Sequence, residues 1–481
     1  MIINRRNFLF QMTVVTAGVA VGFGGLQRRA QAFTADATLA AMRADGFGEL
    51  IPTATQNTGE TFLALPKGFH YKVLGKSGSL MSDGNKTPAF HDGMACFTVG
   101  NELRLIRNHE VSNDEVPKAA SAIGVNPYDA TAAGGTTTLV INPKTREVVK
   151  DFVSLSGTLR NCAGGKTPWG SWISCEETTL GQGICAKETG EKIGGYPKSH
   201  GYCFEVFASA NSTVEPLPLK AMGRFKHEAV AVDKHTGTLY LTEDAKTAGF
   251  YRFIPQRKQH LADGGELQML KIKGMGAFDF RKGIKTGQRF ETTWVTIYNP
   301  DPLTADFDEA AVYKQGLAQG GATFSRLEGA YADNRGRIYF VSTDGGDLQG
   351  GQIWRYKRKG KKDGVLTLVF ESPSRTVLDM PDNICLKPNS ELLFICEDSD
   401  YKSAGGTPEN YLRILAPNGK IADFAKNITT GFENSEFAGS TFSEDGKTLF
   451  VNLQAVGATF AIWGDWDSFK DHTMRETNAD I

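Results

Sequence analysis

The amino-acid sequence predicts an all-β fold, a six-bladed β-propeller with a few inserted helices. One strand–turn–strand pattern recurs six times along the chain, with further strand-like sequence between the copies. The chain also carries 54 glycines in 481 residues, and together with many short runs of Val, Ile, Phe and Tyr they indicate a turn-rich, mostly β protein. Repeated hairpins in one long chain are typical of a propeller, in which each blade is a small antiparallel sheet.

The N-terminus reads as a twin-arginine export leader. Arg5 and Arg6 precede a Phe-Leu pair, an apolar run spans roughly residues 12–26, and an Ala-Gln-Ala cleavage site follows. An ordinary secretory signal or a membrane anchor is the alternative, but the paired arginines and the short, Gly-rich apolar run favour the twin-arginine pathway. We therefore expect residues 1–32 to be a signal peptide and residues 33–481 a single mature domain. The twin-arginine machinery would export this domain already folded, so the mature protein would be periplasmic or secreted.

Composition narrows the function further. The formal net charge is −1, so the chain has no basic field that would attract nucleic acid. No apolar run after the leader approaches the ~18 residues of a membrane span. Seven cysteines are an odd number for an oxidising compartment, so at least one thiol is unpaired and needs a reason such as burial or metal ligation. We expect a monomer, because one closed propeller buries its own core.

Six segments share the repeated pattern. Each has a polar or acidic opening, an alternating strand, a turn rich in Asn, Asp or Gly, and an aliphatic strand, which marks a β-hairpin. The segments are 90–110, 160–178, 226–245, 326–346, 380–399 and 436–454. A β-sandwich with coincidental hairpins is the alternative. The longest spacing between copies contains residues 297–320, an insertion that we expect to carry a helix near the active face.

Propeller geometry would bring the ends of these hairpins together, because the first strands of all blades line one central channel. The residues that open the first strands would meet at one mouth: Asp92, Cys162, Glu228, Glu328, Asp382 and Glu436. The residues that end the second strands would lie close by: Glu110, Glu177, Glu243, Asp344 and Glu397. Crowded carboxylates raise each other's pKa strongly unless cations compensate. The pattern therefore predicts a metal site.

The kinds of ligand indicate which metals would bind. Any one of these acids alone is better explained as a turn residue or a hairpin-end cap, and only the shared register favours ligation. Cys162 occupies the carboxylate register before Ala-Gly-Gly, so we interpret it as a thiolate ligand. Carboxylate and amide oxygens suit Ca²⁺, whereas a thiolate among carboxylates indicates a transition metal such as iron. Zinc is the alternative, although no CxxC pair or HExxH motif supports it.

Other polar side chains should point away from the mouth. His91, His109 and His227 directly precede acids on alternating strands, so we expect them on the opposite face as supporting or structural residues. Four further cysteines lie within strand runs and should be buried, and a disulfide among them is left open. They are Cys175, Cys203, Cys385 and Cys396.

At these residues the sequence resembles the PhoX family of exported alkaline phosphatases. The matching pieces are the twin-arginine leader, RNCAGGKTPWGSWISCEET, KHEAVAVD, RLEGAYAD, PDNICLKP and EFAGSTFS. The resemblance implies a six-bladed propeller that hydrolyses phosphomonoesters at a cluster of two ferric ions and two or three calcium ions bridged by an oxo group.

The resemblance also implies roles for individual residues. Arg326, two residues before Glu328, matches the arginine that binds the phosphate and is the implied catalytic residue. The positions that match the cysteine and glutamate ligands of the iron site are Cys162, Glu177, Glu228 and Glu328. The positions that resemble calcium ligands are Asp382 and Glu436. Further supporting candidates are Asn161, Asn383 and Glu397.

Three functions remain open from the sequence. The first is an alkaline phosphomonoesterase acting on small phosphate esters; no Ser-His-Asp arrangement or P-loop competes with it. The second is a calcium-dependent propeller lactonase or esterase, for which a thiolate such as Cys162 would have no use. The third is a non-catalytic propeller whose metal ions only brace the channel.

Overall fold

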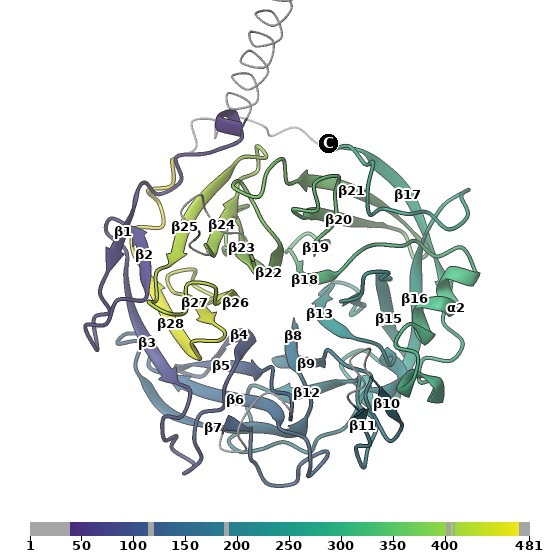
Figure 1. Ribbon diagram of the computed structural model, residues 1–481, viewed down its shortest axis with the longest axis horizontal. Helices are drawn as coiled ribbons and strands as arrows, with labels where there is room; N and C mark the ends of the chain where they lie inside the picture. The colour runs from purple at the N-terminus through teal and green to yellow at the C-terminus, as the bar shows by residue number, and fades with distance from the viewer. Residues whose placement is uncertain (1–38, 114–119, 187–191, 401–405, 407–408, 471–481) are drawn as a thin grey trace, which may run out of the picture.

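The computed structural model describes residues 39–113, 120–186, 192–400, 406 and 409–470, and the expected leader at residues 1–32 lies outside this part of the chain. The described chain is all-β with a propeller-like arrangement (Figure 1). The innermost strands are β4 (His91–Val99), β8 (Asn161–Lys166), β13 (His227–Val232), β18 (Leu327–Ala332), β22 (Pro381–Leu386) and β26 (Phe437–Phe442). Each contacts the next around the centre, and β26 contacts β4.

Each innermost strand pairs antiparallel with the strand that follows it in sequence, which confirms the repeated hairpins. The second strands are β5 (Glu102–His109), β9 (Ser171–Glu176), β14 (Leu239–Glu243), β19 (Arg337–Ser342), β23 (Leu393–Glu397) and β27 (Leu449–Leu453). The outer strands are β6 (Gly134–Ile141), β7 (Val148–Thr158), β12 (Cys203–Phe207), β15 (Tyr251–Pro255), β16 (Gly265–Ile272), β17 (Arg289–Thr296), β20 (Gln352–Lys359), β21 (Asp363–Glu371), β24 (Tyr411–Leu415), β25 (Ile421–Asn427) and β28 (Ala458–Trp463).

The two ends of the described chain close the ring. β3 (His70–Lys76) pairs with β28, so an early strand completes the sheet of the last hairpin. Two more early strands, β1 (Leu50–Thr53) and β2 (Leu63–Pro66), extend the sheet of β22–β25. Because β-pairing joins both ends of the chain, the ring is held by backbone hydrogen bonds rather than by side chains alone.

The sheets do not divide one to one into six blades. β4–β7 form a four-stranded sheet and β8, β9 and β12 a three-stranded sheet, but β13–β21 form one nine-stranded sheet through pairing of β17 with β21. The remaining strands are β10 (Ile184–Ala186) and β11 (Lys192–Gly194), which form a small hairpin. The propeller-like all-β architecture is therefore confirmed, and the sheet count alone does not fix the number of blades.

Helices are few and short within the described residues. The 3₁₀ helices there include η2 (Lys220–Met222), η3 (Leu261–Asp263) and η4 (Leu303–Asp306). The α-helical residues are 39–41 and those of α2 (Ala311–Ala318). Both η4 and α2 lie in the insertion 297–320, which confirms the helix expected there. Within the described residues, no helix has the length and apolar character needed to cross a membrane.

The hydrophobic core lies between neighbouring hairpins of the ring. Tyr240 of β14 and Trp354 of β20 belong to one buried cluster, together with Phe250 and Phe340, whose rings stack at 4.1 Å between centroids. Each such side chain contributes about 1.5–3 kcal/mol on burial. This packing fixes the innermost strands relative to one another.

One irregularity recurs in all the innermost strands. The pairing register shifts just after the first paired residue, for example between His227 and Val230 in β13, and between Leu327 and Ala330 in β18. The same shift occurs in β4, β8 and β22, and in β26 it follows the second paired residue. Bulges of this kind re-aim side chains, and in all of these strands except β26 the opening residue of the repeat lies inside the shift.

Candidate metal centre at the mouth of the channel

The bulged openings bring three carboxylates together. Glu228 of β13, Glu328 of β18 and Asp382 of β22 each offer one oxygen within 4.8 Å of the others. All three are buried. They come from three neighbouring innermost strands, so the convergence predicted from the repeat register is present in the structure.

Glycines beside the acids permit this approach. Gly329 follows Glu328, and a Cβ at this position would lie 2.4 Å from the carbonyl oxygen of Asp382. Gly439 of β26 has φ +63°, and a Cβ there would lie 2.4 Å from the carbonyl oxygen of Asp92. Both distances are far shorter than van der Waals contact, so a larger residue would force the innermost strands apart.

Burial and mutual repulsion make these acids hard to ionise. Burial raises the pKa of Glu228 well above its usual value, and the charges of Asp382 and Glu177 raise it further. The pKa of Glu328 is raised in the same way by burial and then by Asp244 and Glu228. The same direction holds for three more acids around the mouth, where burial is again the first cause. They are Asp92, Asp382 and Glu436. A cluster of this kind becomes fully charged only when cations are present.

Cys162 lies among these carboxylates. Its Sγ donates to the carbonyl oxygen of His227 at 3.3 Å, and the side chain is buried. Burial, and then the charges of Glu228 and Glu177, raise the pKa of the thiol well above its usual value. Without a cation the residue is therefore a neutral thiol, and a bound metal ion would be needed to hold it as a thiolate.

Acidic doublets end three of the second strands: Glu176-Glu177, Glu243-Asp244 and Glu397-Asp398. The second member of each doublet reaches the mouth. The backbone N–H groups of Glu177, Asp244 and Asp398 donate to the backbone carbonyl oxygens of Arg160, Lys226 and Met380, respectively. Each of these three acceptors lies two residues before the residue that opens an innermost strand: Cys162, Glu228 or Asp382. Glu110 and Thr343 make the same bond to Phe90 and Arg326.

The first member of each doublet points into the blade. Glu176 accepts from His200 Nδ1 at 2.6 Å, and Glu397 accepts from Arg413 Nε at 2.9 Å. Glu243 accepts from the backbone N–H of Gly249 and the hydroxyl of Tyr251, both at 2.8 Å. Successive strand residues face opposite sides, so only one acid of each doublet can point to the acidic centre while the other points into the blade.

This alternation determines where the predicted residues lie. Glu177 and Glu110 reach the mouth as expected. Glu243 and Glu397 do not: the residue after each of them, Asp244 or Asp398, lies at the mouth instead. Thr343 holds the rim position that was expected for Asp344.

Two other predicted positions differ in detail. Asn161 faces the blade, where its amide bonds to Ser174 Oγ at 2.8 Å, while Asn383 donates to Asp382 Oδ1 at 2.8 Å on the channel side. Glu436 precedes β26 instead of lying in its bulge, yet it interacts with Asp398. Gln454 was not expected at all; its amide bridges Asp92 and Glu110 at 3.1 and 2.7 Å.

Two arginines cross the rim of the mouth. Arg326 donates to Asp244 Oδ1 at 3.0 Å and to Glu328 Oε1 at 2.8 Å. Arg160, at the equivalent position before Cys162, bonds Glu110 at 2.6 Å and Glu177 at 2.7 Å. Both arginines have positive φ, +41° and +51°. Such backbone is costly for a non-glycine residue and concentrates at functional sites.

A cavity of about 440 Å³ opens beside Arg326. Its lining includes Lys226, Asp244 and Lys246, and also Glu309 and Ala310 from the insertion that carries α2. Glu309 pairs with Lys226 at 3.2 Å. The insertion therefore lies next to the mouth, as expected from the sequence.

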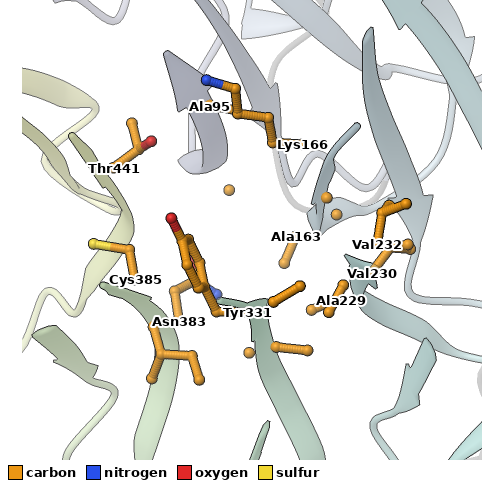
Figure 2. A pocket seen from close by; sticks show the side chains of 18 of the residues that line it. Ala95, Ala163, Lys166, Ala229, Val230, Val232, Tyr331, Asn383, Cys385 and Thr441 are labelled. Atoms are coloured by element: carbon orange, nitrogen blue, oxygen red, sulfur yellow. The ribbon is translucent and has the colours of Figure 1, made fainter. Parts of the chain in front are cut away.

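A second cavity, of about 350 Å³, occupies the channel on the other side of the ring of acids. Its walls are mainly small apolar residues of the innermost strands, and none of the channel carboxylates lines it. In Figure 2, Tyr331 and Cys385 face Ala163 and Val230 across this space. The acids of the mouth therefore do not line this cavity, whose own carboxylates are those of Asp333 and Glu444.

The histidines and cysteines off the mouth are buried as predicted. His91, His109 and His227 are fully buried. Burial lowers the pKa of His227 to about 4, so this side chain is neutral. Free and buried thiols, within the described residues, are Cys96, Cys162, Cys175, Cys203, Cys385 and Cys396.

The fold and the mouth together define a β-propeller-like protein with a buried acidic centre and basic side chains at its rim. The family model described as alkaline phosphatase PhoX matches residues 46–457. The chain belongs to this family, which places it among the phosphatases. No curated protein sequence matches the chain.

Among solved structures, the chain is similar to Pseudomonas fluorescens PhoX in complex with vanadate, a transition state analogue. The TM-score is 0.63 at 19% identity, over 87% of this chain and 98% of that chain. This likeness supports the fold. A gluconolactonase from Xanthomonas campestris gives a TM-score of 0.39 at 11% identity, over 88% of this chain and 97% of that chain. At that TM-score the likeness has no bearing on the reaction.

The residues at the mouth fit a cluster of metal ions. Buried acids whose pKa values are raised by their neighbours lack a compensating charge, which cations would supply. Oxygen donors dominate the set and suit Ca²⁺, and the single thiol of Cys162 suits a softer ion such as iron.

Proposed function

We propose that this phosphatase hydrolyses phosphomonoesters at the channel mouth, at alkaline pH. The observation that carries the proposal is the position of Arg326, whose guanidinium contacts Asp244 and Glu328 at the edge of the acidic centre. Only arginine offers a planar pair of donors that matches two phosphoryl oxygens. A phosphate bound there would therefore lie between this guanidinium and the carboxylate cluster.

The chain's own residues would position the ester. The carboxylates of Asp244 and Glu328 hold the Arg326 side chain in place before substrate arrives, so little conformational freedom is lost on binding. The adjacent cavity, lined by Lys226 and Lys246, has room for the alcohol part of the ester. Arg326 is the residue that we expect to stabilise charge on the transferring phosphoryl group.

The metals that we propose are iron and calcium. Cys162, Glu177, Glu228 and Glu328 would hold ferric ions. The resemblance to the family implies two of them, and metal analysis of the purified protein tests that number. Asp382 and Glu436 would hold calcium, with Asn383 in support and with Asp398 beside Glu436. When bound, these cations supply Lewis acidity and neutralise charge on the phosphoryl oxygens.

We also infer the finer features of fold and location. Six innermost strands in a closed ring support six blades, with two of them fused through β17 and β21. The Arg5-Arg6 leader supports export by the twin-arginine machinery to the periplasm or beyond. The closed ring supports a monomer.

A substrate panel tests the proposed reaction. Exported, metal-loaded protein is assayed at alkaline pH with p-nitrophenyl phosphate, p-nitrophenyl acetate and a δ-lactone. The proposal expects turnover of the phosphate ester alone, and loss of that turnover after prolonged treatment with EGTA. Turnover of the lactone or the acetate without the phosphate would replace the proposal with the carboxyl-ester hydrolase. No turnover of any substrate by protein shown to contain its metals would favour the non-catalytic propeller.

A further inference from the structure

A second group of metal-ligating side chains lies outside the mouth. Cys175 of β9 and Cys203 of β12 are direct partners across the three-stranded sheet, and their Sγ atoms are 3.6 Å apart. His227 of β13 completes the group, with one ligand atom from each residue within 4.8 Å of the others. All three side chains are fully buried.

The imidazole of His227 is oriented like a metal ligand. Its Nε2 lies 3.0 Å from the carbonyl oxygen of Gly223, to which an Nε2–H would donate. That tautomer leaves a lone pair on Nδ1, and Nδ1 is buried without any hydrogen-bond partner. The ring of Phe225 packs on the imidazole at 3.7 Å between centroids and limits its rotation. Metal-bound histidines commonly donate their other ring N–H to a carbonyl in this way, and an orphaned buried nitrogen needs an explanation.

We propose that Cys175, Cys203 and His227 bind one structural zinc ion. Binding would replace the two thiol protons, which leave to solvent, with two Zn–S bonds and one Zn–N bond. Two thiolates, a neutral imidazole and Zn²⁺ sum to zero charge, which suits a buried site, and one water molecule would complete the four ligands of a tetrahedral ion. Two sulfurs on a tetrahedral zinc lie roughly 3.8 Å apart, close to the observed separation, so small side-chain rotations would complete the site.

This site is separate from the phosphatase centre and lies directly behind it. His227 and Glu228 are consecutive on β13 and face opposite sides of the strand, and Cys175 lies two residues before Glu177. The zinc ion would tie the sheet of β8, β9 and β12 to the nine-stranded sheet, to which it is not joined by strand pairing. It would thereby fix the ends of the two strands that supply Glu177 and Glu228 to the mouth.

A disulfide between Cys175 and Cys203 is the competing state, since the thiols are adjacent in a protein expected to reach an oxidising compartment. A disulfide would leave His227 Nδ1 without a partner, whereas zinc satisfies all three side chains. The two states also differ in the number of free thiols, which can be counted in the wild-type protein.

The test combines zinc content with a thiol count on the full exported protein, purified without chelators. Zinc per chain is measured by mass spectrometry for the wild type, for Cys203→Ala and for the control Cys96→Ala, which removes a buried thiol elsewhere. The proposal expects about one zinc ion in the wild type and the control, and a loss of about one in Cys203→Ala. Equal zinc in all three proteins would overturn it, as would a wild type without zinc.

The thiol count stands even if Cys203→Ala does not fold. Wild-type protein is denatured and alkylated with and without a reductant. The proposal expects all seven cysteines to react without the reductant. Two cysteines that react only after reduction, identified as Cys175 and Cys203 by peptide mapping, would establish the disulfide and refute the zinc site. Cobalt substitution adds a spectroscopic readout: a thiolate-to-cobalt band should persist in Cys162→Ser, which removes the thiol at the mouth, and vanish in the double variant Cys162→Ser/Cys203→Ala.

Discussion

Arg326 folds back onto Glu328, two residues later on the same chain, with Nη2 2.8 Å from Oε1. This contact depends on the left-handed backbone at Arg326, where φ is +41°. The turn sends the chain into β18 and sets the guanidinium across the carboxylate that β18 delivers. A cation and an acid of the centre are thereby positioned by a single strained residue.

The acidic doublets offer a matched pair of substitutions. Asp244→Asn removes the carboxylate that holds Arg326, so we expect kcat/KM for a phosphate ester to fall by about 10–100-fold, as for the loss of a charge-assisted hydrogen bond. Glu243→Gln alters a buried acceptor of two hydrogen bonds, and we expect it to lower the free energy of unfolding by about 1–3 kcal/mol. Steady-state kinetics and denaturant unfolding on both variants separate the two roles.

The two variants also serve as controls for each other, because one should affect activity and the other stability. Asp244→Asn should leave the unfolding midpoint almost unchanged, and folded Glu243→Gln should retain most of its kcat. If Glu243→Gln lost activity without losing stability, the division of roles within the doublets would be wrong.

Cys162 provides a test of the metal set. Replacement by Ser removes the soft donor but keeps a similar volume, so we expect bound iron to fall while calcium changes little. Metal analysis and the visible absorption of the purified protein measure the change, with Cys385→Ser as a buried thiol away from the carboxylates. Unchanged iron in Cys162→Ser would remove this residue from the site.

The pH dependence of stability should reverse when metals are removed. Burial raises the pKa of Glu177 from 4.5 to about 8, despite the opposing charge of Arg160. In this window the folded metal-free state holds more protons than the unfolded state, so its stability should fall as pH rises from about 4.5 to 8. Bound cations stabilise the ionised carboxylates, so the loaded protein should not show this loss.

Thermal melts of chelator-treated and metal-loaded protein across this pH range check the prediction. A metal-free protein whose melting temperature rose steadily from pH 5 to pH 8 would contradict the assigned burial and crowding of the acids.

The close approach of the innermost strands can be tested at Gly329. Gly329→Ala places a Cβ 2.4 Å from the carbonyl oxygen of Asp382, so we expect it to separate β18 from β22. The expected cost is about 1–3 kcal/mol of stability, together with weaker metal binding. Gly276→Ala is the control, since a Cβ there meets nothing within 4 Å. Equal stability and metal content in the two variants would show that the strands tolerate the separation.

The sequence predicted the hairpins and the opening acids because both follow from local pattern. Alternation and turn residues located each hairpin, and Glu228, Glu328 and Asp382 converge as their shared register required. The strand-end acids were harder, because the turns of the hairpins differ in length by one residue: the pair nearest the turn is Ala332 with Ile338 in one hairpin and Val232 with Leu239 in another. Spacing alone therefore selected Glu243, whereas the folded strand presents Asp244.

Other features depend on contacts between distant segments. Gln454 lies far from Asp92 in sequence but bonds to it at 3.1 Å, and no local pattern marks this amide. The burial of Glu176 against His200 likewise needs β9 and the segment before β12 to be side by side. Doublets of acids at strand ends are the one signal that was available, since alternation requires their two members to face opposite sides.

The most direct test of the account compares wild-type protein with Arg326→Ala at equal, measured iron and calcium content. Arg335→Ala, an exposed arginine paired with Glu391, serves as the control. We predict that kcat/KM for p-nitrophenyl phosphate falls by at least about 100-fold in Arg326→Ala and is unchanged in Arg335→Ala. Full phosphatase activity in a metal-replete Arg326→Ala protein would contradict a phosphate site at this mouth.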